Sequence, residues 1–264
     1  MAEIPNVHLS LPNSAENVLV VRQALSGVAA VLALDAIETN DVNTAVTEAC
    51  NNVVMHAYGG GDGPLEVDVY ALPQSLAVVV RDRGRGIRER VGVGVGERVG
   101  EGELDGVGAH TGMGIPVIQA LSRRVEFTEP LDGGTRVRME FDAPTSAALA
   151  PVDGDRDGPA SAPDGPNPLP GAIELQLAPN AIARAVLPRV LSALAARAYF
   201  STDRIADVQL IADVLAANAD DSIGASQLDV GVTIAPRNLE LRVGPPHTDE
   251  AFELTLVDRR REGD

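Results

Sequence analysis

The stretch EACNNVVMHAY, residues 48–58, reads as the second half of a helix that has one polar and one apolar side. Glu48, Asn52 and His56 follow one another at intervals of four residues, which puts them on one edge of a helix. Apolar residues at helical spacing form a neighbouring stripe that we expect to be buried: Val42, Ala45, Val46, Ala49 and Val53. The polar edge fits either an ordinary solvated helix face or a ligand site, and the motif alone does not decide between them.

The segments before this stretch read as one strand and one further helix. We expect NVHLSLPN, residues 6–13, to be a short edge strand and residues 15–35 to be a long amphipathic helix. The helix that carries Glu48 should begin at Asp41, whose side chain can cap it, and should stop at the glycines of residues 59–61.

The segments after it read mainly as strands. LEVDVYAL (65–72) and SLAVVVRD (75–82) predict a hairpin, residues 115–124 a short helix, and VEFTEP (125–130) with TRVRMEFD (135–142) a last hairpin. Helices come early and strands late, so we predict an α+β fold. It should be a two-layer sandwich in which a mixed, mostly antiparallel sheet is covered by helices on one face.

Three glycine-containing motifs follow the helix, and each could meet a ligand. In RDRGRGI (81–87), Asp82 can accept a hydrogen bond from an exocyclic amine, while Gly84 and Gly86 let a flat base approach the backbone. HTGMGI (110–115) leads into a helix whose free N–H groups could hold phosphates. Gly134 and Thr135 open the final strand. Each motif alone also fits an ordinary turn.

In this order and spacing, EACNNVVMHAY, RDRGRGI, HTGMGI and GGTRVRMEF (133–141) resemble the N, G1, G2 and G3 boxes of the histidine-kinase-like ATPases, the GHKL superfamily. The resemblance covers nearly all of residues 1–142 and implies ATP and Mg²⁺ as cofactors. It implies that Glu48 is the general base and that Asn52 holds Mg²⁺ through its side-chain oxygen.

The same resemblance implies roles for the glycine motifs. Asp82 would bind the adenine amino group, with Gly84 and Gly86 against the base and Thr135 near the adenine end. Residues 87–111, rich in glycine and acidic residues, would be a mobile ATP lid. The residues implied at the phosphates are those of the second glycine motif: His110, Thr111, Gly112, Met113 and Gly114.

Among these ATPases, the chain is most similar to anti-sigma-factor serine kinases. Such a protein phosphorylates an anti-anti-sigma factor and alternately holds a sigma factor. His110 stands where members of that group often carry an arginine, and a histidine is only partly charged near neutral pH, which leaves nucleotide binding better supported than kinase activity. Two alternatives remain: a non-catalytic binding module whose lid responds to ATP, and the catalytic domain of a histidine kinase acting in trans.

The rest of the chain reads as a linker and a repeat. Residues 143–170 are crowded with Pro, Gly, Ala, Ser and Asp, and they divide an ATPase domain (1–142) from a second, smaller α+β domain (171–264). DVQLIADVLAAN (207–218) parallels DVNTAVTEACNN (41–52), so Asp207 matches Asp41 and Asn218 matches Asn52. Val214 stands where Glu48 would be. We expect a degenerate copy without nucleotide boxes, giving a monomer with an internal pseudo-dimer or a homodimer.

Composition bounds the remaining possibilities. The formal net charge of -17 over 264 residues disfavours direct nucleic-acid binding, and all 21 basic residues are arginine, which excludes a lysine-dependent P-loop. The single cysteine, Cys50, excludes an internal disulfide. The N-terminus lacks the pattern of a signal peptide and no apolar run suggests a membrane span, so we expect a cytoplasmic protein.

Overall fold

The computed structural model describes residues 4–72, 74–86, 114–131, 133–144, 172–178, 180–222, 228–244 and 252–259. The expected linker lies outside the described residues except for residues 143 and 144. The division of the chain into two domains therefore stays a prediction.

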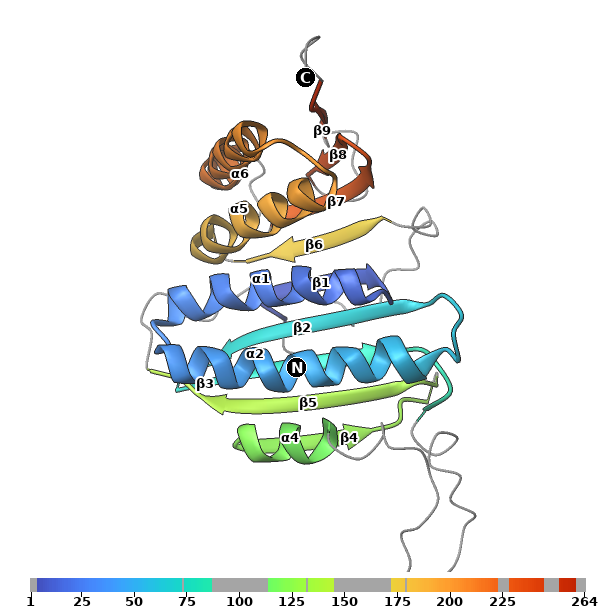
Figure 1. The fold of residues 1–264 in the computed structure, drawn as a ribbon. Helices are drawn as coiled ribbons and strands as arrows, with labels where there is room; N and C mark the ends of the chain where they lie inside the picture. The colour runs from blue at the N-terminus through green and yellow to red at the C-terminus, as the bar shows by residue number, and fades with distance from the viewer. Residues whose placement is uncertain are drawn as a thin grey trace, which may run out of the picture.

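One nine-stranded sheet runs through the whole described part of the molecule, in the order β4-β5-β3-β2-β1-β6-β7-β8-β9 (Figure 1). Every described pairing is antiparallel, so the α+β class is confirmed with an antiparallel rather than a mixed sheet. The strands are β1 (Val7–Pro12), β2 (Pro64–Leu72), β3 (Ser75–Asp82), β4 (Arg124–Thr128), β5 (Thr135–Asp142), β6 (Ile173–Leu177), β7 (Leu228–Ala235), β8 (Asn238–Val243) and β9 (Phe252–Val257).

Helices cover one face of this sheet (Figure 1). They are α1 (Ala15–Leu32), α2 (Ala36–Asn52), α4 (Gly114–Leu121), α5 (Asn180–Arg197) and α6 (Thr202–Ser222), and a π-helical turn, η1 (Val53–Ala57), continues α2. By length and hydropathy α1 would qualify as a membrane span, contrary to the sequence expectation. Many of its apolar side chains are instead buried in the core, with Val21, Leu25 and Val28 at most 2% exposed.

The start of α2 differs from the sequence prediction. Asp35, not Asp41, is the N-cap, and its carboxylate accepts hydrogen bonds from the backbone N–H groups of Ile37 and Glu38 at 2.8 Å. The Glu38 side chain accepts in return from the Asp35 N–H at 2.8 Å. This capping box satisfies otherwise unpaired N–H groups at the helix start, so the helix begins one and a half turns earlier than Asp41 would place it.

The position of β1 also differs from the prediction of an edge strand. β1 pairs with β2 on one side, where Val7 lies opposite Val69, and with β6 on the other, where Val7 lies opposite Leu177. The chain after residue 172 therefore extends the sheet beyond β1. The expectation failed because the pairing partner lies more than 160 residues away in the sequence, where no local pattern announces it.

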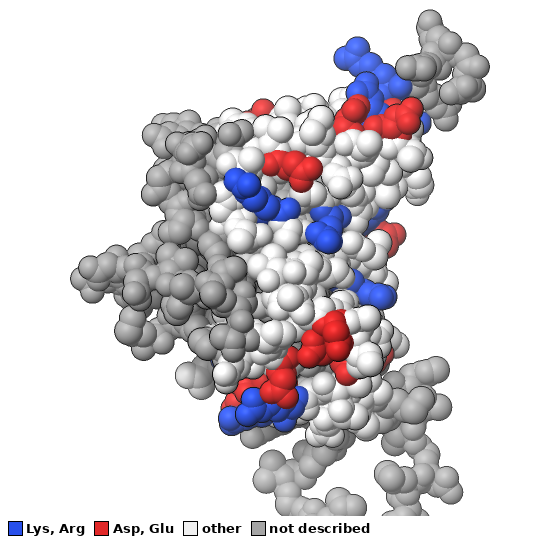
Figure 2. All heavy atoms as spheres, turned by 90° about the vertical axis from the view of Figure 1, so that its left-hand side faces the viewer, with Lys and Arg blue, Asp and Glu red and all other residues white. Residues whose placement is uncertain are grey.

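Acidic and basic side chains are mixed on the surface of the molecule. Figure 2 shows one side of the molecule, on which acidic and basic side chains lie among uncharged surface. Several of them form ion pairs, such as Arg204 with Asp207 at 2.9 Å and Arg123 with Asp142 at 2.9 Å. Exposed pairs of this kind add little stability.

Candidate functional site

The helix α2 and the start of α4 bring three predicted site residues together. A Cβ atom added to Gly114, the first residue of α4, would lie 3.3 Å from Oε2 of Glu48 and 3.5 Å from Oδ1 of Asn52. Both side chains are partly buried. The absence of a side chain at Gly114 therefore keeps an acidic and an amide group open to the N-terminus of a helix, where N–H groups favour anions.

His56, the third residue of the polar edge predicted from the sequence, lies in η1 and is partly buried. The widened turn of η1 begins directly after Asn52. Turns of this type are often found at functional sites, and sequence spacing alone does not reveal them.

Asp82 ends strand β3 with its side chain buried, at 1% exposure. Its Oδ1 accepts a hydrogen bond from the backbone N–H of Gly84 at 2.8 Å. Across the sheet Asp82 lies opposite Thr135, the first residue of β5, which is 5% exposed. The register of β3 with β5 thus places the two predicted adenine-end residues beside each other.

Two of the glycines around Asp82, Gly84 and Gly134, leave no room for a side chain. A Cβ on Gly84 would collide with the carbonyl group of Ala57, and one on Gly134 would collide with the Asp82 carbonyl oxygen. Gly86 and Gly134 also have positive φ angles of 74° and 80°, which glycine adopts without strain. The absent side chains at Gly84 and Gly134 therefore let the turn after β3 pack directly against Ala57 and against the start of β5. The buried Asp82 carboxylate beside this packing supplies a hydrogen-bond acceptor.

The end of the α2–η1 helix holds the Asp82–Gly84 turn in place. The Arg83 N–H donates to the hydroxyl of Tyr58 at 2.9 Å, and that hydroxyl donates to the Pro64 carbonyl oxygen at 2.6 Å. The Arg85 N–H donates to the Ala57 carbonyl oxygen at 3.0 Å. Burial raises the pKa of Tyr58, so its hydroxyl stays protonated and able to donate.

Sequence reasoning gave Tyr58 no role of its own, although the tyrosine directly after the helix was a usable signal. It ties the helix of Glu48 and Asn52 to the turn of Asp82. A Cβ on Gly63 would overlap the Tyr58 ring, so that glycine lets the ring lie flat against the backbone.

Asn52 could provide one of the oxygen ligands of a Mg²⁺ ion. In the described part of the chain, no group of three or more His, Cys, Asp or Glu side chains could hold a metal alone. Asn52 supplies one oxygen, so further ligands would be phosphate oxygens and water, which is the usual situation for Mg²⁺ on nucleotides. Cys50, near Asn52, is fully buried, and burial raises its pKa to about 12, which makes it unsuited to be a nucleophile.

The second glycine motif is only partly described. Its residues His110, Thr111, Gly112 and Met113 and the predicted lid lie outside the described residues. Their expected roles stay predictions.

Known proteins resemble the half of the chain that holds this site. A family model described as a histidine kinase-like ATPase domain matches residues 11–141. The serine-protein kinase RsbW of Halalkalibacterium halodurans is 30% identical over 138 residues, which are 50% of this chain and 80% of that protein. The serine-protein kinase RsbW of Bacillus pumilus is 36% identical over 81 residues, 30% of this chain and 50% of that protein.

Among solved structures, the RsbU and RsbW domains of Rv1364c from Mycobacterium tuberculosis match 52% of this chain and 32% of theirs. The identity there is 20% and the TM-score 0.37, too low to argue from. The sequence matches suffice: with 30% identity across 80% of a known relative, and a family model over residues 11–141, the chain belongs to the histidine kinase-like ATPase family.

Proposed function

We propose that the protein is an ATP-dependent serine kinase of the anti-sigma type, which phosphorylates an anti-anti-sigma factor and alternately holds a sigma factor. The observation that carries the proposal is the grouping of Glu48 and Asn52 at Gly114. The buried Asp82 ends β3, and the turn that follows it is hydrogen-bonded to the end of the α2–η1 helix. Two relatives are named serine-protein kinases, which supports serine as the acceptor.

The proposed binding roles follow from these positions. Asp82 accepts a hydrogen bond from the adenine amino group, Gly84 and Gly86 lie against the base, and Thr135 lies at the same end. Asn52 offers its side-chain oxygen to Mg²⁺, which would neutralise charge on the phosphates. The N–H groups at Gly114 and the preceding motif approach the phosphate oxygens.

In the proposed transfer, Glu48 accepts the proton of the serine hydroxyl as its oxygen bonds to the terminal phosphorus of ATP. The bond from that phosphorus to the bridging oxygen breaks, and ADP leaves with the electron pair. A base positioned in this way typically speeds a reaction by about 100-fold to 10,000-fold. Such a kinase and its partners would meet in the cytoplasm.

The test is phosphoryl transfer from radiolabelled Mg-ATP to the anti-anti-sigma proteins encoded in the same genome. We expect acid-stable phosphoserine with the wild type, and at least about 100-fold slower transfer with Glu48→Gln. ATP affinity, measured by calorimetry, should change little. Glu126→Gln is the matched control, because Glu126 is exposed on β4.

Each other outcome has a meaning. A wild type that binds ATP but labels no partner would replace the kinase with an ATP-responsive binding module. Acid-labile phosphohistidine on a partner would indicate a histidine kinase domain acting in trans. Failure to bind ATP at all would refute the site.

A further inference from the structure

Residues 172–259 repeat the element order of residues 7–142. The first series is β1, α1, α2, β2, β3, β5, and the second is β6, α5, α6, β7, β8, β9. In Figure 1 the second series lies above the first and adds its strands to the same sheet, with its helices on the same face.

The first three elements match residue by residue at an offset of 166. Val7 and Ile173 (173 - 7 = 166) are 0% and 1% exposed, and Leu25 and Leu191 (191 - 25 = 166) are 2% and 0% exposed. The same offset pairs other residues that are all buried: Val20 with Val186, Val21 with Leu187, Val28 with Leu194, Val42 with Val208, and Cys50 with Ala216. A shared helical fold alone does not preserve this burial pattern across two helices and a strand.

The hairpin that follows repeats as well. Val69 faces Val7 in the first series, and Val232 faces Ile173 in the second, which gives an offset of 163 (232 - 69). At that offset the turn residue Gln74, with a φ of 65°, matches Arg237, with a φ of 59°. A non-glycine residue with positive φ is uncommon, so its recurrence at the matched position is independent evidence for the repeat.

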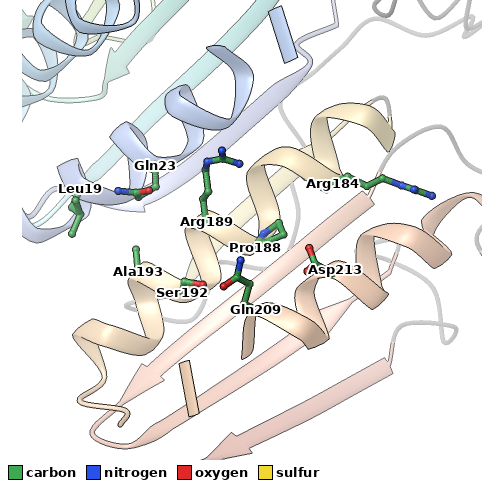
Figure 3. A pocket seen from close by; sticks show the side chains of 9 residues that line it. All are labelled: Leu19, Gln23, Arg184, Pro188, Arg189, Ser192, Ala193, Gln209 and Asp213. Atoms are coloured by element: carbon green, nitrogen blue, oxygen red, sulfur yellow. The ribbon is translucent and has the colours of Figure 1, made fainter. Parts of the chain in front are cut away.

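The two halves are related by an approximate two-fold axis. β1 and β6 pair antiparallel with Leu9 opposite Leu175, and these are matched residues (175 - 9 = 166). The helices above obey the same symmetry. Gln23 and its match Arg189 (189 - 23 = 166) both line the recess between α1, α5 and α6 (Figure 3).

Close packing holds the halves together at this axis. A Cβ on Gly27 of α1 would lie 2.8 Å from the Ala185 carbonyl oxygen and 2.9 Å from Cα of Val186 on α5. Arg197, at the end of α5, donates to Asn17 and pairs with Glu16 at 2.7 Å. Gly27 therefore permits close packing of α1 on α5, and any larger residue would force the two helices apart.

The chemistry of the first half is missing from the second. Val214, 53% exposed, stands at the match of Glu48 (214 - 48 = 166). Residues 83–134 join β3 to β5 and include α4 and β4, whereas only residues 244–251 join β8 to β9. A connection of that length cannot hold an eight-residue helix and a five-residue strand.

We propose that the second half is a degenerate copy of the first that serves as a built-in partner subunit. It occupies the β1 edge and the α1 face, surfaces that fit a second unit of the same fold. Each chain is then a self-contained pair with one nucleotide site. The number of nucleotide sites rests on the proposed function, whereas the pairing of the halves does not.

The test uses the full chain with a protease site introduced between residues 150 and 165. After cleavage we expect both fragments to sediment together at micromolar concentration, with the mass of one chain. In Gly27→Ala the cleaved halves should dissociate roughly tenfold to a hundredfold more readily, because overpacking forces the helices apart. Gly231→Ala is the matched control, since its Cβ would meet only Cβ of Arg242, at 3.8 Å.

The outcomes separate the two parts of the proposal. If the cleaved wild-type halves sediment separately, the proposal of a built-in partner subunit is wrong. It is also wrong if the intact chain forms a stable dimer through β1. Calorimetry with Mg-ATP should give one site per chain, and two sites would overturn the degeneracy. If no ATP binds but the fragments stay together, the proposed function fails and the pairing stands.

Discussion

At the scale of single residues, His8 has the most clearly defined electrostatic environment in the sheet. Its Nδ1 lies 2.6 Å from Oδ1 of Asp68, which faces it across the β1–β2 pairing. Burial would lower the pKa of His8, but the hydrogen bond to Asp68 and the negative charges of Asp68, Glu66 and Glu174 together raise it above 6.5. Glu66 is itself held by Arg83 at 2.8 Å and Arg81 at 3.7 Å.

This environment predicts a stability that depends on pH. Because the folded pKa of His8 is raised, protonation stabilises the fold fully below the unfolded pKa of 6.5, and this contribution is lost as pH rises through the folded value. We expect the free energy of unfolding to fall as the pH rises from below 6.5 through the raised folded pKa of His8. His8→Gln should lack this part of the pH dependence, as measured by urea unfolding followed by circular dichroism.

The difference between the pH profiles of the wild type and His8→Gln separates the contribution of His8 to stability from that of other titrating groups. Asp68→Asn removes the partner rather than the imidazole and should abolish most of the same difference. Parallel pH profiles for the wild type and His8→Gln would show that the Asp68 contact contributes nothing to stability.

At the scale of elements, the junction of η1, β2 and β3 sets the geometry of the proposed adenine end. The hydroxyl of Tyr58 accepts a hydrogen bond from the Arg83 N–H and donates one to the Pro64 carbonyl oxygen. It thereby fixes the end of β3 to the start of β2 and to the helix that carries Asn52. We regard Tyr58 as a positioning residue for the Asp82 turn.

We therefore expect Tyr58→Phe to weaken ATP binding by about fivefold to tenfold, since a lost hydrogen bond of this kind costs on the order of 1 kcal/mol. Calorimetry with Mg-ATP and with Mg-GTP is the measurement. The preference for ATP over GTP should also narrow, because the turn that carries Asp82 is no longer fixed.

The control for that variant is Tyr70→Phe, which also removes one phenolic hydroxyl. Tyr70 lies on β2, is 8% exposed and is away from the site. It should leave both nucleotide affinities unchanged. If Tyr58→Phe lowers the melting temperature but keeps the affinity for ATP and its preference over GTP, the tyrosine is structural only.

Elements with a strong local pattern could be predicted from the sequence. The apolar stripe of α2 and the hairpin of β2 and β3 are where periodicity placed them, because burial on one face imposes that periodicity. The predicted start of α2 at Asp41 was wrong, although the sequence contains the signal for the true start, because Asp35 and Glu38 have the spacing of a capping box. The π-helical turn η1 has no comparable sequence signature.

The proposed site divides in the same way. The resemblance to the boxes of the histidine-kinase-like ATPases pointed to Glu48, Asn52, Asp82 and Thr135, because those boxes can be recognised from residue order and spacing along the chain. Their grouping depends on the register of β3 with β5 and on the packing of α4 on α2, which are long-range contacts. The position of Tyr58 directly after the helix was a usable signal, but its hydrogen bond with Arg83, 25 residues further along the chain, could not be foreseen from the sequence.

At the scale of the whole molecule, one sheet and one core join the two halves. A single cluster of buried residues includes Val67 and Val78 from the first half and Leu191 and Leu241 from the second. Sequence spacing indicated the repeat, but it could not show that β1 and β6 pair, since that contact closes a very long loop. A continuous core predicts that both halves unfold together.

The last prediction follows from this continuity. Leu191 is fully buried in α5, and Leu191→Ala should destabilise the fold by about 2–5 kcal/mol through the cavity it leaves. The loss should be equal in both halves, so hydrogen exchange of β3 and of β8 should rise at the same lowered urea concentration. Mg-ATP, bound only in the first half, should restore protection to β8 as well as β3, because it stabilises the one folded state. Exchange in β8 that precedes exchange in β3, and that ATP does not slow, would mean that the halves fold independently in spite of their shared sheet.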